Sequence, residues 1–392
     1  MELRGTRDVF WGYRRPNGSV GVRNHVLVMA SAVCANDTVR RIAAAVPGVV
    51  PLTHQHGCAQ LGADAEQTRR TLVGFGSNPN VAAVLVVGLG CETGRAEVLA
   101  EEIAKTGKPV ELIIIQKAGG TVKAAEAGVV VASRFVRETS EARREECGVH
   151  ELILALECGA SDASSGVSAN PATGVATDLL VAAGGTAILS ETSELIGAEH
   201  LLAKRCASPK VAERLLHIVR RMEQEAMRMG VDIRGANPTP GNIEGGLTTI
   251  EEKSLGCIYK AGTTQIMEVL DYAERPTSRG LVVMDTPGQD IESITGMVAG
   301  GAQICVFTTG LGAVTGCPIA PVIKVCGNTA TFDRMRDNLD LNAGTIVDGL
   351  MTVPEVGEQI YREVIEVSSG RLTRAESLGC ADFAITRIGH TM

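Results

Sequence analysis

The sequence has 392 residues, a formal net charge of −8 and only 3% aromatic residues. Because so long a chain exceeds one ordinary hydrophobic core, we expect two or three domains. Few aromatic side chains and scattered basic residues argue against nucleic-acid binding. No run approaches the ~20 apolar residues of a membrane span, and no apolar leader opens the chain. We therefore expect a cytoplasmic enzyme that acts on small molecules.

Cysteine usage points to the same compartment. The eleven cysteines are an odd number, are spread over the whole chain and follow no secretory leader. Such a distribution is typical of reduced cytosolic thiols rather than of a disulfide framework.

In the first half, short apolar runs alternate with stretches of helical period. The predicted strands are 25–32, 48–52, 81–90 and 110–116, and the predicted helices are 38–46, 64–75, 94–106, 122–128 and 136–147. This alternation requires a mostly parallel, Rossmann-like sheet. We therefore predict a first α/β domain over residues 1–140.

The same alternation restarts in the second half. The predicted strands are 151–157, 186–190, 281–285, 302–308 and 322–325, and the predicted helices are 171–183 and 209–229. We predict a C-terminal α/β domain over residues 141–392, so the fold class is α/β with two or three layered units. A Gly-, Asn- and Thr-rich loop, 234–249, bridges into the second half of this domain, and its length and composition indicate a binding loop.

Four cysteines each follow a predicted strand in a short loop: Cys34, Cys58, Cys91 and Cys158. The carboxyl ends of buried parallel strands converge on one ligand crevice. We therefore predict that these four thiols share one site.

Two of these loops carry further candidate ligands. In an extended segment His54, His56 and Cys58 share a face and offer two nitrogens and one sulfur to a transition metal, although a polar loop explains them equally well. The segment 88–92 opens a helix whose N-terminus favours a thiolate or carboxylate, or Cys91 is simply structural. This segment matches neither the dinucleotide nor the ATP motif, so neither cofactor is implied.

The segment 157–166 holds the densest cluster of small polar groups in the chain. Ser161 and Ser165 with neighbouring backbone N–H groups could cradle a carboxylate or a hydroxyl-rich substrate, and Asp162 could bind a metal or a sugar hydroxyl. The alternative is a capped start of the following helix. The number of polar groups favours a functional loop.

A second polar cluster follows the bridging loop. Thr249 and Glu252 have the spacing of a capping box, so this segment could be only a helix N-terminus. On the functional side, Lys253 beside carboxylates could bind an anionic substrate or, when desolvated, serve as a base.

Four long motifs together resemble the altronate and galactarate dehydratases and the related large subunit of sulfolactate sulfo-lyase. They are 12–24, 88–92, 158–171 and 241–253. Full-length members of this family begin with a small SAF-type domain, which this sequence lacks. The resemblance therefore implies the large subunit of a two-component lyase with a small SAF-domain partner, or a stand-alone remnant, in a homo- or hetero-oligomer.

The resemblance also implies a reaction. It implies iron-dependent removal of water from an altronate-type aldonate or a galactarate-type aldarate, which gives a 2-keto-3-deoxy acid. The alternatives are release of sulfite from sulfolactate and a non-catalytic subunit that binds sugar acids. Fe²⁺ is the expected cofactor, with Mn²⁺ and an iron–sulfur cluster left open.

Residue roles within this resemblance are assigned from residue type and loop position. The predicted base is Lys253 or His54, and the predicted acids are Glu92 and Glu252. The predicted metal ligands are Cys34, His56, Cys58, Cys91 and Cys158. The predicted substrate contacts are Arg23, Ser161, Asp162, Ser165, Thr248 and Asn328.

Overall fold

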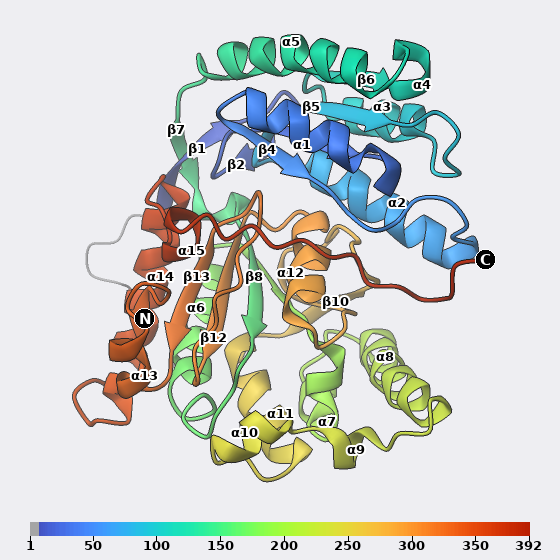
Figure 1. Ribbon diagram of the computed structural model, residues 1–392. Coiled ribbons are helices and arrows are strands. Elements are labelled where there is room, and N and C mark those ends of the chain that lie inside the picture. Colours follow the sequence, from blue (N-terminus) through green and yellow to red (C-terminus); the bar gives the residue numbers. More distant parts are fainter. Residues whose placement is uncertain (1–7) are drawn as a thin grey trace.

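The computed structural model describes residues 8–392 and contains two parallel sheets joined by a small antiparallel one (Figure 1). The predicted α/β class with mostly parallel sheets is confirmed. Within the described part of the chain, every helix is too short or too polar to cross a lipid bilayer.

The first parallel sheet has four strands in the order β4-β3-β5-β6. These strands are β3 (His25–Ala30), β4 (Val49–Leu52), β5 (Val81–Gly88) and β6 (Val110–Ile114). Helices α1 (Asn36–Ala45) and α5 (Thr121–Thr139) pack on one face, and α2 (Gly62–Ser77) and α3 (Ala96–Ala104) pack on the other. Because both faces are covered, the strands read as nearly continuous apolar runs.

The small sheet contains β1 (Val9–Arg14), β2 (Val20–Gly21) and β7 (Glu145–Gly148), all paired antiparallel. This corrects the helix predicted over 136–147, because α5 continues to Thr139 and residues 145–148 form a strand. The charged residues Glu145 and Glu146 pair with Gly12 and Trp11 of β1. This long-range strand pairing overrides the local preference of the segment for a helix.

The second parallel sheet has seven strands in the order β10-β11-β9-β8-β12-β13-β14. They are β8 (Ile153–Cys158), β9 (Thr186–Leu189), β10 (Ile266–Leu270), β11 (Gly280–Met284), β12 (Ile304–Thr309), β13 (Val322–Cys326) and β14 (Leu341–Asn342). Helices α6 (Ala169–Ala182) and α14 (Val353–Ser368) cover one face. Helix α12 (Asp290–Ala299) covers the other face and packs against α2, so one apolar core joins the two sheets.

The bridging segment is more ordered than the predicted loop. Residues 234–249 contain most of α9 (Ile233–Ala236) and all of α10 (Pro240–Glu244), and they lead into α11 (Ile250–Ile258). A capping box between Thr239 and Asn242 begins α10. Helix α9 contacts α8 (Pro209–Arg228) and lies below α7 (Glu199–Ala203) in Figure 1.

Asn80 links the first sheet to the second. Its Nδ2 donates to the carbonyl oxygens of Gln303 and Ile319, both at 2.8 Å, and its Oδ1 accepts from the Val22 N–H at 2.8 Å. Because replacement by alanine leaves three buried backbone groups unpaired, Asn80→Ala should lower the free energy of unfolding by about 3 kcal/mol in denaturant titration. Gln224→Ala, at an exposed position on α8, is the control and should change it by less than ~0.5 kcal/mol. Equal effects of the two substitutions would contradict the assigned role.

Candidate functional site

The candidate site lies at the carboxyl end of β8, where the chain order of the seven-stranded sheet reverses. Strand β9 lies on one side of β8 and β12 on the other. Ligands of open α/β sheets bind at such points. A pocket of about 140 Å³ opens there, and Cys158, the last residue of β8, lines it together with Cys257 of α11.

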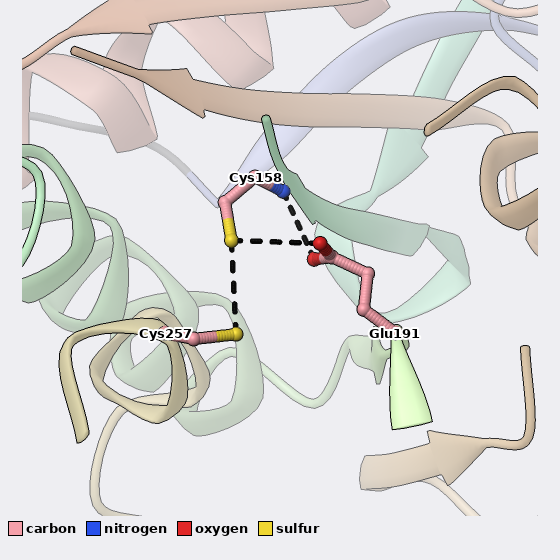
Figure 2. A group of neighbouring side chains, drawn as sticks. All are labelled: Cys158, Glu191 and Cys257. Atoms are coloured by element: carbon pink, nitrogen blue, oxygen red, sulfur yellow. Dashed lines mark hydrogen bonds between the residues drawn. The ribbon is translucent and has the colours of Figure 1, made fainter. Parts of the chain in front are cut away.

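Two thiols, a carboxylate and an ammonium form the base of this site. The Cys158 Sγ lies 3.6 Å from the Cys257 Sγ and donates to Glu191 Oε1 at 3.6 Å, while the Cys158 N–H donates to Glu191 Oε2 at 3.0 Å (Figure 2). The Nζ of Lys260 donates to Glu191 Oε2 at 2.5 Å, to the Cys257 Sγ at 2.9 Å and to the Cys158 Sγ at 3.1 Å. All three ammonium protons are therefore used inside the protein.

Lys260 is completely buried, and Glu191 is only 1% exposed. Burial alone would lower the pKa of Lys260, but the thiols of Cys158 and Cys257 and the carboxylate of Glu191 reverse this, so its pKa is raised well above its ordinary value. The pKa of Cys158 is also raised, by its contact with the Cys257 thiol and by burial. We therefore treat Lys260 as an ammonium.

Cys158, Glu191 and Cys257 are also a group of metal-ligating type, because their ligand atoms all lie within 4.8 Å of one another. Two sulfurs and one carboxylate oxygen suit a transition metal. The Nζ of Lys260, however, already donates to all three side chains and takes the place of the cation. As arranged, this group does not fit a metal ion.

A second lysine borders the pocket. The Nζ of Lys253 lies 3.0 Å from Glu194 Oε2 and donates to Asn237 Oδ1 at 2.9 Å. Burial lowers the pKa of Lys253, but the charge of Glu194 more than offsets this, and the net pKa is raised. The raised pKa favours the predicted anion contact over the predicted role as a base.

Asp162 is held at the pocket wall by the serines around it. Its Oδ1 accepts from the Ser164 Oγ at 2.5 Å, from the Ser165 N–H at 3.0 Å and from the Ser165 Oγ at 3.2 Å, whereas Oδ2 receives none of these bonds. On the other side, a Cβ placed on Gly310 would lie 1.9 Å from Asp162 Oδ1. The position therefore requires glycine, and Asp162 has little freedom to move.

Two further carboxyl groups lie behind the pocket. Burial, followed by the charges of Glu191 and Glu194, raises the pKa of Asp290 to about 7. Burial and the charges of Glu191 and Asp290 raise the pKa of Glu157 well above its usual range, and Glu157 accepts from the Ser293 Oγ at 2.7 Å. Both carboxyl groups therefore keep their protons to a higher pH than an ordinary carboxylic acid does.

Six of the predicted site residues line the pocket, whereas Thr248 and Asn328 do not. The predicted residues that line the pocket are Cys158, Ser161, Asp162, Ser165, Glu252 and Lys253. Thr248 does not line the pocket but donates to Glu252 from its N–H at 2.8 Å. Asn328 begins α13 (Thr329–Arg334) by accepting from the Thr331 N–H.

Arg23 lies away from the pocket. Its guanidinium pairs with Glu376 and donates to the carbonyl oxygens of Val22, Val367 and Arg371. The side chain is 6% exposed, so its hydrogen-bonding groups are already occupied within the fold. This arrangement assigns Arg23 to packing between the first residues and the C-terminal segment rather than to substrate contact.

The prediction that four thiols share one site is corrected. Cys34, Cys58 and Cys91 follow strands of the four-stranded sheet, whereas Cys158 ends a strand of the seven-stranded sheet. Among the described residues, the group of metal-ligating side chains around Cys158 contains none of the other three. The chain folds into two separate parallel sheets, so these four thiols follow strands that do not share one edge.

The two histidines do not share a face with Cys58. His54 Nε2 lies 2.9 Å from the Ala30 carbonyl oxygen, and His56 Nε2 lies 3.1 Å from that of Ile385. Both imidazoles are buried, whereas Cys58 is exposed. Burial lowers the pKa of His54 to about 4. The predicted N, N, S ligand set is therefore not formed.

The two predicted acids are held as carboxylates. Glu92 accepts from the Ser31 Oγ at 2.6 Å and from the Gly90 N–H at 2.5 Å, and these bonds outweigh burial, so its pKa is lowered. The bonds from Thr248 likewise lower the pKa of Glu252. A lowered pKa opposes a role as proton donor at neutral pH.

Sequence reasoning missed the residues that surround Cys158. Lys260 lies in a short 3-10 helix, η4 (Tyr259–Ala261), which packs against α6 and β9, and Glu191 follows β9, so only the fold brings the two side chains together. Asp290 begins α12 in a pattern that also reads as ordinary helix capping. The one available signal was the polar Ser190-Glu191-Thr192 directly after a predicted strand.

Two family models together match nearly the whole chain. The model "D-galactarate dehydratase/Altronate hydrolase, second domain" matches residues 12–140, and "D-galactarate/Altronate dehydratase, C-terminal" matches residues 149–391.

Named relatives match over similar lengths. The "(2R)-sulfolactate sulfo-lyase subunit beta" of Chromohalobacter salexigens is 42% identical over 99% of each chain. The altronate dehydratase of Bacillus subtilis is 34% identical over 98% of this chain and 78% of its own. The galactarate dehydratase (L-threo-forming) of Escherichia coli is 38% identical over 92% of this chain and 73% of its own.

Proposed function

Because the chain belongs to the D-galactarate/altronate dehydratase family of lyases, we propose that it dehydrates a sugar acid to a 2-keto-3-deoxy acid. The substrate class is an altronate-type aldonate or a galactarate-type aldarate. The reaction takes the proton next to the carboxylate and expels hydroxide from the neighbouring carbon, and the resulting enol becomes the keto acid.

The observation that carries this proposal is the composition of the pocket at the end of β8. Its lining combines the ammonium of Lys253 with the hydroxyl groups of Ser161 and Ser165 and the carboxylate of Asp162. An ammonium binds a substrate carboxylate, and hydroxyl and carboxylate groups bind sugar hydroxyls. This mixture suits a hydroxyl-rich acid.

We assign roles from these contacts. Lys253 stays protonated, so it binds the substrate carboxylate and offsets the negative charge that develops when the neighbouring proton leaves. Asp162, with Oδ1 fixed by serines, presents Oδ2 to a substrate hydroxyl or proton. Lys260 holds the thiols and Glu191 in place beneath them. Because the Lys260 ammonium occupies the position between Cys158, Glu191 and Cys257, these three side chains do not hold a metal ion for the reaction.

Sulfolactate sulfo-lyase activity is the second candidate. The observation that favours it is the 42% identity with a subunit of that enzyme over 99% of both chains. Sulfite would leave in place of hydroxide. The hydroxyl groups of Ser161 and Ser165 in the pocket favour a substrate with several hydroxyl groups over sulfolactate, which has one.

We also propose that the chain works as the large subunit beside a small SAF-domain partner and needs iron, with Mn²⁺ as the alternative ion. A purified complex should therefore be assayed anaerobically and with ferrous iron against altronate, galactarate and sulfolactate. The readouts are the 2-keto-3-deoxy acid and free sulfite. Keto-acid formation supports the first function and sulfite supports the second. Binding of a sugar acid with neither product would indicate the non-catalytic subunit.

Gly310 provides a test of the pocket wall. In Gly310→Ala the added Cβ meets Asp162 Oδ1, so we expect kcat/KM for the sugar acid to fall about tenfold or more, with a smaller effect on the unfolding midpoint. The matched control is Gly235→Ala, because nothing lies within 4 Å of a Cβ at that position. Equal kinetics in the two variants would remove Asp162 from the proposed site.

A further inference from the structure

Three cysteines differ from the rest in exposure. Of the eleven, only Cys34, Cys58 and Cys91 are exposed, and the others are buried or partly buried. Free cysteine is normally among the most buried residue types, and an exposed thiol is open to oxidation. Three such thiols in one unit therefore call for a function.

All three exposed thiols follow strands that meet at one edge. Cys34 follows β3, Cys58 follows β4 and Cys91 follows β5, and these strands are neighbours in the order β4-β3-β5. Because β3 comes first in the chain and its successors lie on both sides, this is the switch point of the four-stranded sheet. We call Cys34, Cys58 and Cys91 the three-thiol edge.

Hydrogen bonds hold the loops of this edge together. The Val33 N–H donates to the His56 carbonyl oxygen at 2.7 Å and joins the first two loops. The Ser31 Oγ donates to Glu92 Oε1 at 2.6 Å and joins the first loop to the third. Cys34 lies in a short 3-10 helix, η1 (Val33–Ala35), that leads directly into α1. The thiols are therefore presented by a preformed frame.

The type of donor atom selects the ligand. His54 and His56 are engaged with backbone carbonyls, so sulfur is what the edge offers. Within the described chain, these thiols form no group whose ligand atoms all lie within 4.8 Å, the closeness that a single shared ion needs. A cluster of several irons and sulfides spans more widely separated thiolates. We infer that the three-thiol edge holds an iron–sulfur cluster with one iron left open to a non-protein ligand.

This inference deepens the proposed function by assigning the iron to the four-stranded sheet instead of the Cys158 pocket. When bound, an iron with an open position would supply Lewis-acid chemistry to an oxygen ligand at this edge. Detection of the cluster does not require turnover. A cluster without any lyase product would refute the proposed function alone, and lyase activity in cluster-free protein would refute the cluster alone.

The test is anaerobic reconstitution of the full chain with ferrous iron and sulfide, followed by removal of unbound metal. We expect bound iron and acid-labile sulfide in similar amounts, a broad visible absorption from thiolate and sulfide, and an EPR signal after reduction or mild oxidation. Cys34→Ser, Cys58→Ser and Cys91→Ser should each lose most of these signals, whereas Cys206→Ser should keep them.

Folding of each variant is checked by its circular dichroism and thermal unfolding, which substitutions at exposed loop positions should leave nearly unchanged. The inference is overturned if the wild-type chain retains iron without sulfide, or neither. It is also overturned if folded variants of the three-thiol edge keep the same iron and sulfide as Cys206→Ser.

Discussion

Replacing Lys260 by methionine should lower the free energy of unfolding by about 3–5 kcal/mol and slow the proposed elimination by roughly a hundredfold. Glu191 is 1% exposed and would lose its cationic partner. A lone buried carboxylate is costly, and the two thiols of the pocket floor would lose a shared donor. Denaturant titration and steady-state kinetics measure the two effects.

A double variant separates charge from packing. In Lys260→Met with Glu191→Gln, the buried charge is removed on both sides and an oxygen remains to accept from the Cys158 N–H. Most of the lost stability should return, although activity should stay low. If Lys260→Met alone were as stable as wild type, the ammonium would not be the internal counter-ion.

A titration with cobalt ions tests whether Lys260 takes the place of a metal. Lys260→Ala should expose two sulfurs and one oxygen to the ion and bind cobalt, whereas wild type should not.

The sequence predicted the fold well because its signals were local. Runs such as 81–88 are apolar throughout, which requires a strand covered on both faces, and the structure has β5 at those residues. The strand over 145–148 was missed because only its distant partner β1 makes it a strand. Local patterns therefore fail where a long-range pairing decides.

The candidate site could be predicted only in part for the same reason. The cluster around Ser161, Asp162 and Ser165 is contiguous, so the sequence shows it directly, and these residues do line the pocket. Lys260 and Glu191 are far apart in the chain and meet only after the helices pack. Which strand ends share a crevice depends on how the chain divides into sheets, and the four thiols were assigned to one crevice for lack of that information.

Asp290 should make both stability and substrate binding depend on pH. Burial and the charges of Glu191 and Glu194 raise its pKa from 3.8 to about 7. Between these two values the folded state keeps the proton and the unfolded state has lost it, so stability falls as pH rises through this window. Wild type should lose about 3 kcal/mol more than Asp290→Asn between about pH 4 and pH 8.

The same titration acts on Lys253, whose charge interacts with that of Asp290. When Asp290 ionises above about pH 7, its negative charge offsets part of the ammonium that binds the substrate carboxylate. A weakening of about 1 kcal/mol corresponds to a roughly fivefold rise in KM between about pH 6 and pH 8. Asp290→Asn should keep the lower KM throughout, and Asp337→Asn, at an exposed position, should behave like wild type. A KM that rises equally in all three proteins would show that another group controls binding.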